Sequence, residues 1–327
     1  MSTEASPAAD PDTIPLVYSI ILTYNNFDDT DECVASVLAQ DYTNQRVIIV
    51  DNHSTDGSGE RLRRKWLGHA DVIDSGANRG VPGGYNAGIE AALAAGADYC
   101  VVFNNDIALA PDFTSALVSL FAAKSDIGIA APLTTYYDDP GRVWFARIQF
   151  DSWFGITRNR YRGQRLSEVP ASPQVQDCDY VLTHATMISR RALEAAGLPD
   201  ERFFYGHDDV DYSLRLRAKG MRCVSLMRPL VRHKVSITAG FRGSGALRPA
   251  AAYTYGLGSV LVGAKHFSGI RAPTFLATLL ALRAPYTMLT FLMAGRPASA
   301  FAYLRGLAAG IRQYGAAFVT GTEAHAS

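Results

Sequence analysis

The sequence has no excess of charge of either sign and no framework of paired cysteines. Its 327 residues contain 31 Lys and Arg and 31 Asp and Glu, so the formal net charge at pH 7 is zero. A neutral chain lacks the basic character of a protein that coats nucleic acid, and we expect no nucleic-acid partner. The four cysteines are far apart without a Cys-x-x-Cys pair, which predicts free thiols in the cytoplasm rather than a disulfide scaffold.

Acidic residues are absent between Asp211 and Glu323. Residues 1–211 contain 16 basic and 30 acidic residues, a net charge of −14, whereas residues 212–327 contain 15 basic and one acidic residue, a net charge of +14. The neutral total is therefore the sum of two oppositely charged parts, which we expect to meet different partners.

Strands and helices alternate in the first 130 residues. Short apolar runs, typical of strands covered on both faces, are separated by stretches with helical periodicity. This alternation predicts an α/β fold with a mainly parallel sheet. The expected strands are 17–24, 46–51, 70–74 and 98–104, and the expected helices are 30–40, 57–67, 84–95 and 113–123.

The pattern changes after residue 132. Aromatic, β-prone segments at 143–150 and 178–188 predict hairpin strands that join or flank the sheet, followed by a helix near 210–219 and short strands near Cys223 and Val231. Residues 247–318 are apolar and helical in pattern. The expected parts are a disordered leader (1–15), a catalytic domain (16–240), a C-terminal helical region (241–319) and a tail (320–327).

Polar clusters follow all four early strands. The carboxyl ends of parallel strands meet at one edge of a sheet, where α/β proteins bind ligands. Turn chemistry alone would explain one such cluster, but four in succession favour a binding site. The clusters are Thr23-Tyr24-Asn25, the loop Asp51 to Gly57 with Asp56, the loop Asn78 to Gly88 with Gly80 and Asn86, and Asn104-Asn105-Asp106.

The glycine-rich loop does not fit a dinucleotide-binding dehydrogenase. The G-x-G-x-x-G fingerprint follows the first strand, whereas these glycines follow the third. Glycines at the start of a helix still indicate close backbone approach to an anionic ligand.

Two further features carry candidate chemistry. Asp106 directly follows an apolar strand and is a suitable oxygen ligand for a divalent cation, and His233, at the end of a later strand, is a candidate second ligand. Asp208, Asp209 and Asp211 stand at the start of a helix. They either stabilise the helix N-terminus or supply a general base towards an acceptor hydroxyl.

These motifs, in this order, resemble the inverting glycosyltransferases of family 2, which have a GT-A fold, and in particular their rhamnosyltransferase-like and galactofuranosyltransferase-like branch. The resemblance runs from about Val17 to His233 and rests on five motifs. They are Thr-Tyr-Asn, Asp-Asn-x-Ser-x-Asp-Gly, Asn-x-Gly…Gly-Gly-x-Asn-x-Gly, Asn-Asn-Asp in place of the DxD motif, and the Asp-Asp-x-Asp segment before Arg-Leu-Arg.

The resemblance implies a role for each position. Residues lining the base and ribose of a nucleotide sugar would be Thr23, Tyr24, Asn25 and Asp51. Residues bordering the nucleotide and its diphosphate would be Asp56, Asn78, Gly80 and Asn86. Asp106 and His233 would bind Mg²⁺ or Mn²⁺, with Asn104 and Asn105 beside them. Asp209 would be the catalytic base, supported by Asp208 and Asp211.

Two positions depart from the family pattern and leave the acceptor open. Asp208 stands where the base motif commonly begins with Glu, and Thr183-His184-Ala185 replaces small residues before the acceptor loop. The implied reaction is a single displacement with inversion, which moves L-rhamnose or, alternatively, galactofuranose or another UDP-linked hexose. The expected acceptor is a hydroxyl of a surface glycan or a lipid-linked glycan.

Two other functions are consistent with parts of the sequence. A nucleotidyltransferase would share the nucleotide pocket and metal carboxylates, but would want basic residues after the first strand, where this chain has none. A carbohydrate-binding or scaffold protein could use aromatic residues on its surface, such as Trp144, Trp153 and Tyr161.

The apolar segment 271–293 leaves three alternatives open. Arg283 and Pro285 interrupt it, so each half is shorter than the ~20 residues that cross a bilayer. The alternatives are a helical hairpin in the membrane interface with Arg outward and Leu and Phe inward, a helical subdomain or homo-oligomer interface buried in protein, and a spanning helix. The first predicts a peripheral protein on the cytoplasmic face of the membrane.

Overall fold

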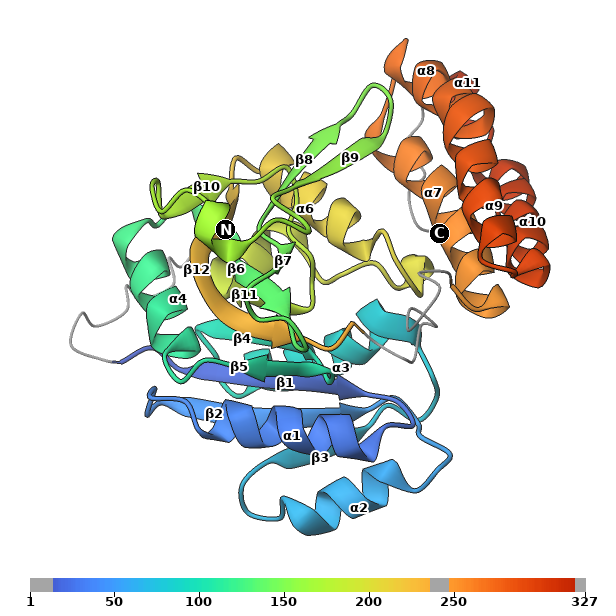
Figure 1. Ribbon diagram of the computed structural model, residues 1–327. Coiled ribbons are helices and arrows are strands. Elements are labelled where there is room, and N and C mark those ends of the chain that lie inside the picture. Colours follow the sequence, from blue (N-terminus) through green and yellow to red (C-terminus); the bar gives the residue numbers. More distant parts are fainter. Residues whose placement is uncertain (1–13, 236–246, 321–327) are drawn as a thin grey trace, which may run out of the picture.

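The computed structural model describes residues 14–235 and 247–320. Nearly all of the expected leader and tail lies outside the described residues. Within them, ten strands form one sheet with the order β10-β12-β6-β11-β4-β1-β2-β3, in which β5 also pairs with β12 and β7 with β6 (Figure 1). This mixed, mainly parallel sheet followed by C-terminal helices confirms the predicted fold class.

The first four strands form the parallel half of the sheet, as predicted. They are β1 (Val17–Thr23), β2 (Gln45–Asp51), β3 (Asp71–Asp74) and β4 (Tyr99–Asn104). Their register aligns Thr23 with Asp51, and Leu22 with Asn104, so the strands end at one edge. The polar clusters that follow them therefore meet there.

Alternate side chains of these strands enter two cores, one on each face of the sheet. Ile21 packs with Val34 on one face, and Ile20 packs with Ile89 on the other. Helix α3 begins four residues earlier than predicted because Pro82 is tolerated in the first turn, where an N–H has no helical partner. The helices are α1 (Phe27–Leu38), α2 (Ser58–Lys65) and α4 (Phe113–Ala123) on the first face and α3 (Gly80–Ala94) on the second.

The second half of the sheet is mixed. Strand β11 (Ala185–Ser189) pairs antiparallel with both β4 and β6 (Ile127–Tyr136). The two short strands expected near Cys223 and Val231 are one strand, β12 (Arg222–His233), whose register shifts around Pro229, a residue without an N–H for the ladder. The remaining strands are β5 (Ile107–Leu109), β7 (Val143–Phe145) and β10 (Val175–Asp177).

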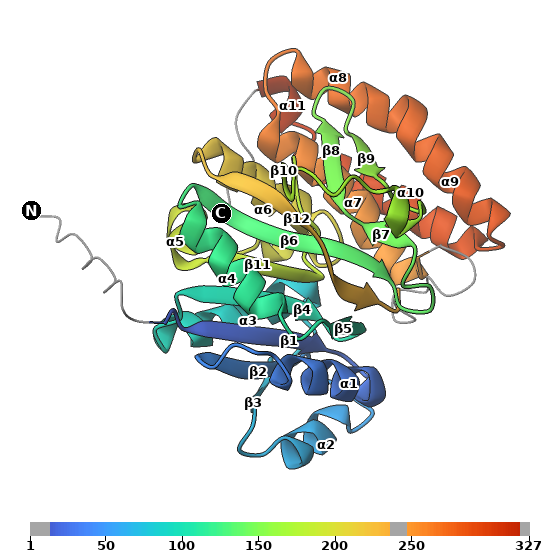
Figure 2. The ribbon, with the colours of Figure 1, turned by 60° about the vertical axis from the view of Figure 1, so that its left-hand side comes forward.

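A separate hairpin and two helices complete the central part. Strands β8 (Arg147–Asp151) and β9 (Ile156–Arg160) pair with each other, and an isolated bridge joins Ile148 of β8 to Tyr180. Both views show this hairpin extending towards the C-terminal helices (Figures 1 and 2). Helices α5 (Arg190–Ala196) and α6 (Asp208–Ala218) lie on the same face as α3, where Leu193 and Leu216 join its core.

The C-terminal region is helical, as predicted. Helices α7 (Pro249–His266) and α10 (Pro297–Tyr314) pack together through Val260, Tyr303 and Leu307. The short helix α11 (Ala317–Thr320) follows. Because α7 residues share a core with α3 and α6, this region is joined to the sheet by continuous apolar packing.

Segment 271–293 is one continuous helix, so the expected interruption at Arg283 and Pro285 does not occur. It consists of α8 (Arg271–Thr278), the π-helical turn η3 (Leu279–Arg283) and α9 (Ala284–Met293), seen as one rod in Figure 2. The wider π-helical turn just before Pro285 accommodates the residue that cannot donate a helical hydrogen bond. In the part of the chain that the structure describes, this helix alone is long and apolar enough to cross a membrane, judged by length and composition.

Candidate active site

The loops after β1 and β2 are joined by hydrogen bonds from Asn25. Its backbone N–H donates to Ser54 at 2.9 Å, and its side-chain oxygen accepts from the backbone of Thr55 at 2.6 Å. Asn25 has φ of 52°, a left-handed conformation that asparagine tolerates better than most residues. Thr23 thus ends β1, and Tyr24 and Asn25 follow it, at the edge where Asp51 ends β2.

Two of the predicted nucleotide-side carboxylates have local hydrogen-bond partners. Asp51 is buried and accepts from the backbone N–H of Ser54 at 2.9 Å. Asp56 is exposed and accepts from the backbone N–H of Ser58 at 2.9 Å, at the start of α2. Burial raises the pKa of Asp56, but the hydrogen bonds from Ser58 and the other favourable interactions together outweigh it and lower the pKa. In this structure Asp56 stabilises a helix N-terminus.

Asn52 connects the second loop to the glycine-rich loop, a role the sequence reasoning missed. Its side-chain N–H groups donate to the Gly80 carbonyl at 2.9 Å and to Asn78 Oδ1 at 3.1 Å, and its oxygen accepts from the Arg79 N–H at 3.1 Å. Asn52 belongs to the Asp-Asn-x-Ser motif, so its position in the second loop could be read from the sequence. The sequence did not reveal that its buried side chain forms hydrogen bonds with the glycine-rich loop.

Gly80 brings the glycine-rich loop against the segment that leads to Asp209. Its φ is 73°, and a Cβ here would overlap the backbone of Phe204. The next residue, Val81, donates its N–H to the Phe204 carbonyl at 2.7 Å. Asn86, predicted beside the nucleotide, is buried and donates to the Pro199 carbonyl and to Glu201, each at 3.0 Å. It supports the segment that reaches Asp209.

Asp106 and His233 meet because β12 pairs antiparallel with β5, which places His233 opposite Ile107. The His233 Nε2 atom lies 3.0 Å from Asp106 Oδ1, and both side chains are buried. Asp106 Oδ2 and His233 Nδ1 are buried and have no hydrogen-bond partner among the residues that the structure describes. Trp144 packs against the ring of His233, with centroids 4.2 Å apart.

This pair suits a hard divalent cation that takes its other ligands from substrate. No group of three His, Cys, Asp or Glu placed to hold a metal exists within the described ranges. Mg²⁺ commonly uses one or two carboxylates together with substrate phosphates and water, and Mn²⁺ accepts similar ligands. An unpaired carboxylate oxygen at the strand-end edge therefore fits a cation held jointly by protein and a diphosphate.

A hydrogen-bonded path connects the Asn104-Asn105-Asp106 cluster to Asp208. The buried Tyr85 hydroxyl lies 2.8 Å from Asn104 Oδ1 and 3.0 Å from the Thr183 carbonyl, and the Thr183 hydroxyl donates to Asp208 at 3.3 Å. Asn105 turns instead towards α1, where it donates to Thr30 at 2.9 Å. The two predicted carboxylate clusters thus belong to one site.

Asp208 and Asp209 begin α6 after a strained turn. Gly206 and His207 have φ of 79° and 70°, and for a histidine this conformation is costly. Asp209 Oδ1 accepts from the Val210 N–H at 2.8 Å. Burial raises the pKa of Asp209, and the neighbouring charge of Asp208 raises it further. A carboxyl group tuned upward in this way is suited to accept a proton near neutral pH.

Asp211 lies apart from Asp209. It is fully buried and contacts Arg215 at 3.0 Å, Lys265 at 2.8 Å and His266 at 2.7 Å. Burial raises the pKa of Asp211, but the His266 hydrogen bond and the cationic charges outweigh it, so the pKa is lowered. Since Lys265 and His266 belong to α7, this cluster anchors the C-terminal helices to α6.

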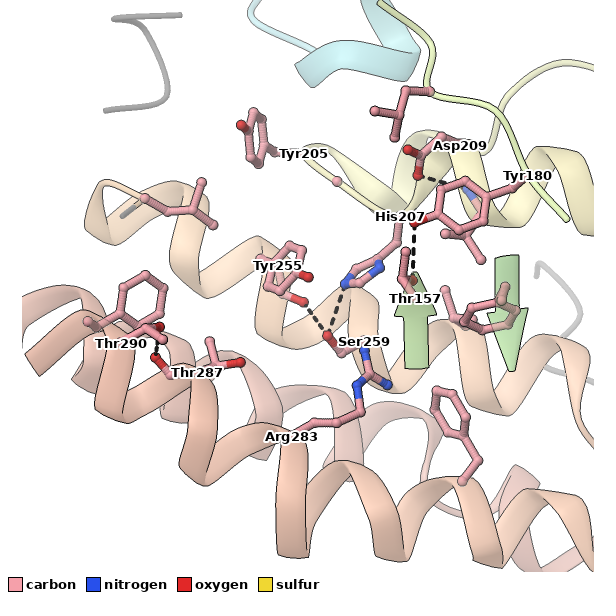
Figure 3. Close-up of a pocket in the computed structure, with 18 of the residues that line it drawn as sticks. Thr157, Tyr180, Tyr205, His207, Asp209, Tyr255, Ser259, Arg283, Thr287 and Thr290 are labelled. Atoms are coloured by element: carbon pink, nitrogen blue, oxygen red, sulfur yellow. Dashed lines mark hydrogen bonds between the residues drawn. The ribbon is translucent and has the colours of Figure 1, made fainter. Parts of the chain in front are cut away.

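A cavity of about 440 Å³ opens beside Asp209 (Figure 3). Figure 3 shows Asp209 on one wall and Arg283 on the other, with Tyr255 and Ser259 of α7 between them. His207 hydrogen-bonds Ser259 at 2.9 Å and stacks on Tyr255. Burial, with the charge of Arg283, lowers the pKa of His207 to about 3, so the ring is neutral at pH 7. No motif in the sequence predicted this cavity, because its lining residues come from segments far apart in the chain.

The model of the glycosyl transferase family 2 matches residues 19–188, more than half of the chain. The chain belongs to glycosyl transferase family 2. This confirms the predicted resemblance, and a glycosyltransferase is the class of enzyme that the motifs indicated.

Curated relatives cover about two thirds of the chain. The galactofuranosyltransferase GlfT1 of Mycobacterium tuberculosis is 25% identical over 209 residues, which are 63% of this chain and 66% of that protein. The dTDP-rhamnosyl transferase RfbF of Shigella flexneri is 23% identical over 201 residues, 61% of this chain and 62% of that protein. The chain thus spans slightly less than two thirds of the length of these relatives.

Solved structures share the fold. The mannosyltransferase PcManGT from Pyrobaculum calidifontis, in complex with GDP-Man and Mn²⁺, has a TM-score of 0.54 and 18% identity, covering 97% of this chain and 90% of that one. GalNAc-T7 with UDP, GalNAc and Mn²⁺ has a TM-score of 0.55 and 13% identity, covering 84% of this chain and 58% of that one. Both likenesses support the GT-A fold.

Proposed function

We propose that this family 2 chain is a metal-dependent, inverting glycosyltransferase that uses Asp209 as its general base. The observation that carries the proposal is the position of Asp209. It borders a cavity large enough for a sugar, and a hydrogen-bonded path runs from its neighbour Asp208 to the predicted metal side of the site. Among the described residues, Asp209 is the one acidic side chain that lines this cavity.

In the proposed reaction, the donor lies along the carboxyl edge of the sheet and the acceptor lies in the cavity. The loops joined by Asn25 and Asn52 hold the nucleotide. Asp209 accepts the proton of the acceptor hydroxyl as that oxygen attacks the anomeric carbon from the face opposite the leaving diphosphate, which inverts the configuration. The close contact between Gly80 and the backbone of Phe204 holds the glycine-rich loop, on the donor side, against the segment that carries Asp209.

Asp106 and His233 are the residues we propose as metal ligands. A cation bound there supplies positive charge to stabilise the departing diphosphate. The two solved neighbours that contain Mn²⁺ support this choice of cofactor.

Two donor sugars are proposed. The names of the curated relatives support galactofuranose and L-rhamnose, and we place L-rhamnose first, with galactofuranose or another UDP-hexose as the alternative. A hydroxyl of a surface glycan or a lipid-linked glycan is the proposed acceptor. A role as a carbohydrate-binding scaffold is less well supported, because Trp144 packs against His233 and His184, and Arg271 lies over the ring of the exposed Trp153.

A panel of nucleotide sugars tests this function. Release of nucleoside diphosphate is measured for dTDP-rhamnose, UDP-galactofuranose and other UDP-hexoses, with Mn²⁺ and with EDTA. One donor should stand out, and its turnover should require the metal. D209N should lower transfer about 10²–10⁴-fold while donor binding, measured by calorimetry, stays near that of the unchanged chain. Near-normal transfer by D209N would remove Asp209 from this role.

We also propose that the outer face of 271–293 contacts the cytoplasmic face of a membrane. Leu282 and Met293 are 65% and 81% exposed on this helix, and no acidic residue occurs from 212 to 322. An exposed apolar face beside basic residues is suited to an anionic lipid surface.

A further inference from the structure

Arg283 places a positive charge inside the cavity instead of on the outer face of its helix. One of the three alternatives that the sequence left open, the interfacial hairpin, has arginine pointing outward and Leu and Phe inward. The structure shows the opposite arrangement, with Leu282 exposed and Arg283 lining the cavity (Figure 3). A long cationic side chain on an amphipathic helix would ordinarily extend to water, so its inward direction needs a reason.

The guanidinium of Arg283 has no anionic partner in the part of the chain described. It forms no ion pair there, and its Nη1 atom is buried without a hydrogen-bond partner. It lies over the Phe275 ring, whose centroid is 5.5 Å from the guanidinium carbon, and against the turn of the β8–β9 hairpin at Gly155. A Cβ at residue 155 would collide with Nη1 and with Phe275, so this hairpin closes tightly over the arginine.

Asp209 does not serve as the counter-ion of Arg283. No hydrogen bond or ion pair between them occurs among the described residues, and they occupy opposite walls of the cavity in Figure 3. Both charges act on the same two side chains, Tyr180 and Tyr255. Burial raises the pKa values of these tyrosines, the charge of Asp209 raises them further, and the charge of Arg283 lowers them. Besides the exposed Arg162 on its lining, the cavity therefore contains a carboxylate suited to proton transfer and a separate cation, Arg283, that has no anionic partner among the described residues.

We propose that Arg283 binds a phosphate group carried by the acceptor substrate. This rests on the proposed function, because it assumes that the acceptor occupies the cavity beside Asp209. The planar guanidinium can donate two parallel hydrogen bonds to phosphate, which repays the cost of burying it. The acceptor then spans the cavity, with its reacting hydroxyl at Asp209 and its phosphate at Arg283.

The rest of the cavity indicates that an apolar group accompanies the phosphate. Aromatic and aliphatic side chains from the hairpin and the C-terminal helices line the cavity together with Arg283. They are Phe150, Val262, Phe275 and Phe291. Either a phosphorylated lipid or a soluble sugar phosphate would supply the phosphate, and binding measurements distinguish the two sources.

Calorimetry on the full chain in EDTA tests the proposal without catalysis. The probes are octyl phosphate, octanol and glucose 1-phosphate. The unchanged chain should bind octyl phosphate about tenfold or more tightly than octanol, since charge-assisted hydrogen bonds to phosphate are lost with the alcohol. R283Q should remove this preference. R271Q is the matched control, because Arg271 begins the same helix but lies over Trp153, outside the cavity lining, and should keep the preference.

The outcomes distinguish a phosphorylated lipid from a soluble sugar phosphate, and both from the absence of phosphate binding at Arg283. Arg283-dependent binding of octyl phosphate but not of glucose 1-phosphate supports a lipid source, and equal binding of both supports a soluble one. Equal affinity of the unchanged chain for octyl phosphate and octanol, or an undiminished preference in R283Q, overturns the proposal. If R283Q melts early, R283M retains the aliphatic stem over Phe275 and carries the same test. Donor turnover without acceptor does not involve Arg283, so failure of the donor panel is a separate result.

Discussion

Replacing Asp211 with asparagine should loosen the attachment of the C-terminal helices to α6. Asp211 Oδ2 accepts from Arg215, and Oδ1 accepts from Lys265 and His266. An asparagine of the same shape has one oxygen, so its NH₂ group must face a donor on one side or the other. The substitution also leaves three basic groups close together without their shared carboxylate.

The size of this effect follows from burial. Asp211 is 0% exposed, while the side chains of Arg215, Lys265 and His266 are 20%, 17% and 12% exposed. Breaking a buried ion pair costs about 3–5 kcal/mol, and the partial exposure of the partners favours the lower end, about 3 kcal/mol. At about 2–3 °C per kcal/mol for a chain of this size, D211N should melt ~6–9 °C below the unchanged chain.

Scanning calorimetry at pH 7 measures the difference, with E60Q as the matched control. Glu60 contacts Arg63 and Arg64 on the surface, where it is 57% exposed, so its loss should cost about 0.5 kcal/mol or less. Because the folded-state pKa of Asp211 is lowered, its contribution is present above the unfolded-state pKa and is lost as pH falls through the folded value. The gap between D211N and the unchanged chain should therefore close in strong acid. A D211N melting temperature within 2 °C of the unchanged chain at pH 7 would refute this reasoning.

Two further predictions concern the base and the membrane. D208N should shift the rising limb of the kcat/KM pH profile to lower pH, because it removes the like charge that raises the pKa of Asp209; an unmoved or higher limb would contradict this origin. The protein should float with anionic liposomes at low salt and less at high salt, and L282D should weaken flotation. L67D is the control, since Leu67 is 78% exposed outside the C-terminal region; no flotation at low salt would exclude the membrane contact.

Most of the parallel half of the sheet could be predicted because local signals suffice there. Apolar runs of strand length and polar residues at their ends mark β1 to β4, and only boundaries shifted, as at α3, where Pro82 lies within the first turn. The second half was harder. Strand β11 enters between β4 and β6, and β12 runs through the bulge at Pro229, because tertiary pairing overrides local pattern.

The donor-side residues could be located from motifs, but their partners could not. Asp106 and His233 are 127 residues apart in the chain, and the structure places their side chains 3.0 Å apart; their role as metal ligands stays a prediction. Asn86 and Asp211 stand in motif positions yet bond to structural partners, since a motif fixes position and not contacts. Arg283 was interpreted as a break in a helix, because no local pattern reveals that a distant hairpin closes over it.

The cavity beside Asp209 is lined both by residues inside the part of the chain that matches the family and by residues beyond it. The region that matches the family ends at residue 188, whereas Tyr255, Ser259 and Arg283 come from beyond it. If the cavity receives the acceptor, as proposed, exchange or drift of the C-terminal helices can alter what is glycosylated while the nucleotide-binding edge stays the same. The donor sugar would then be a property of the sheet edge, and the acceptor a property of the helices after residue 247.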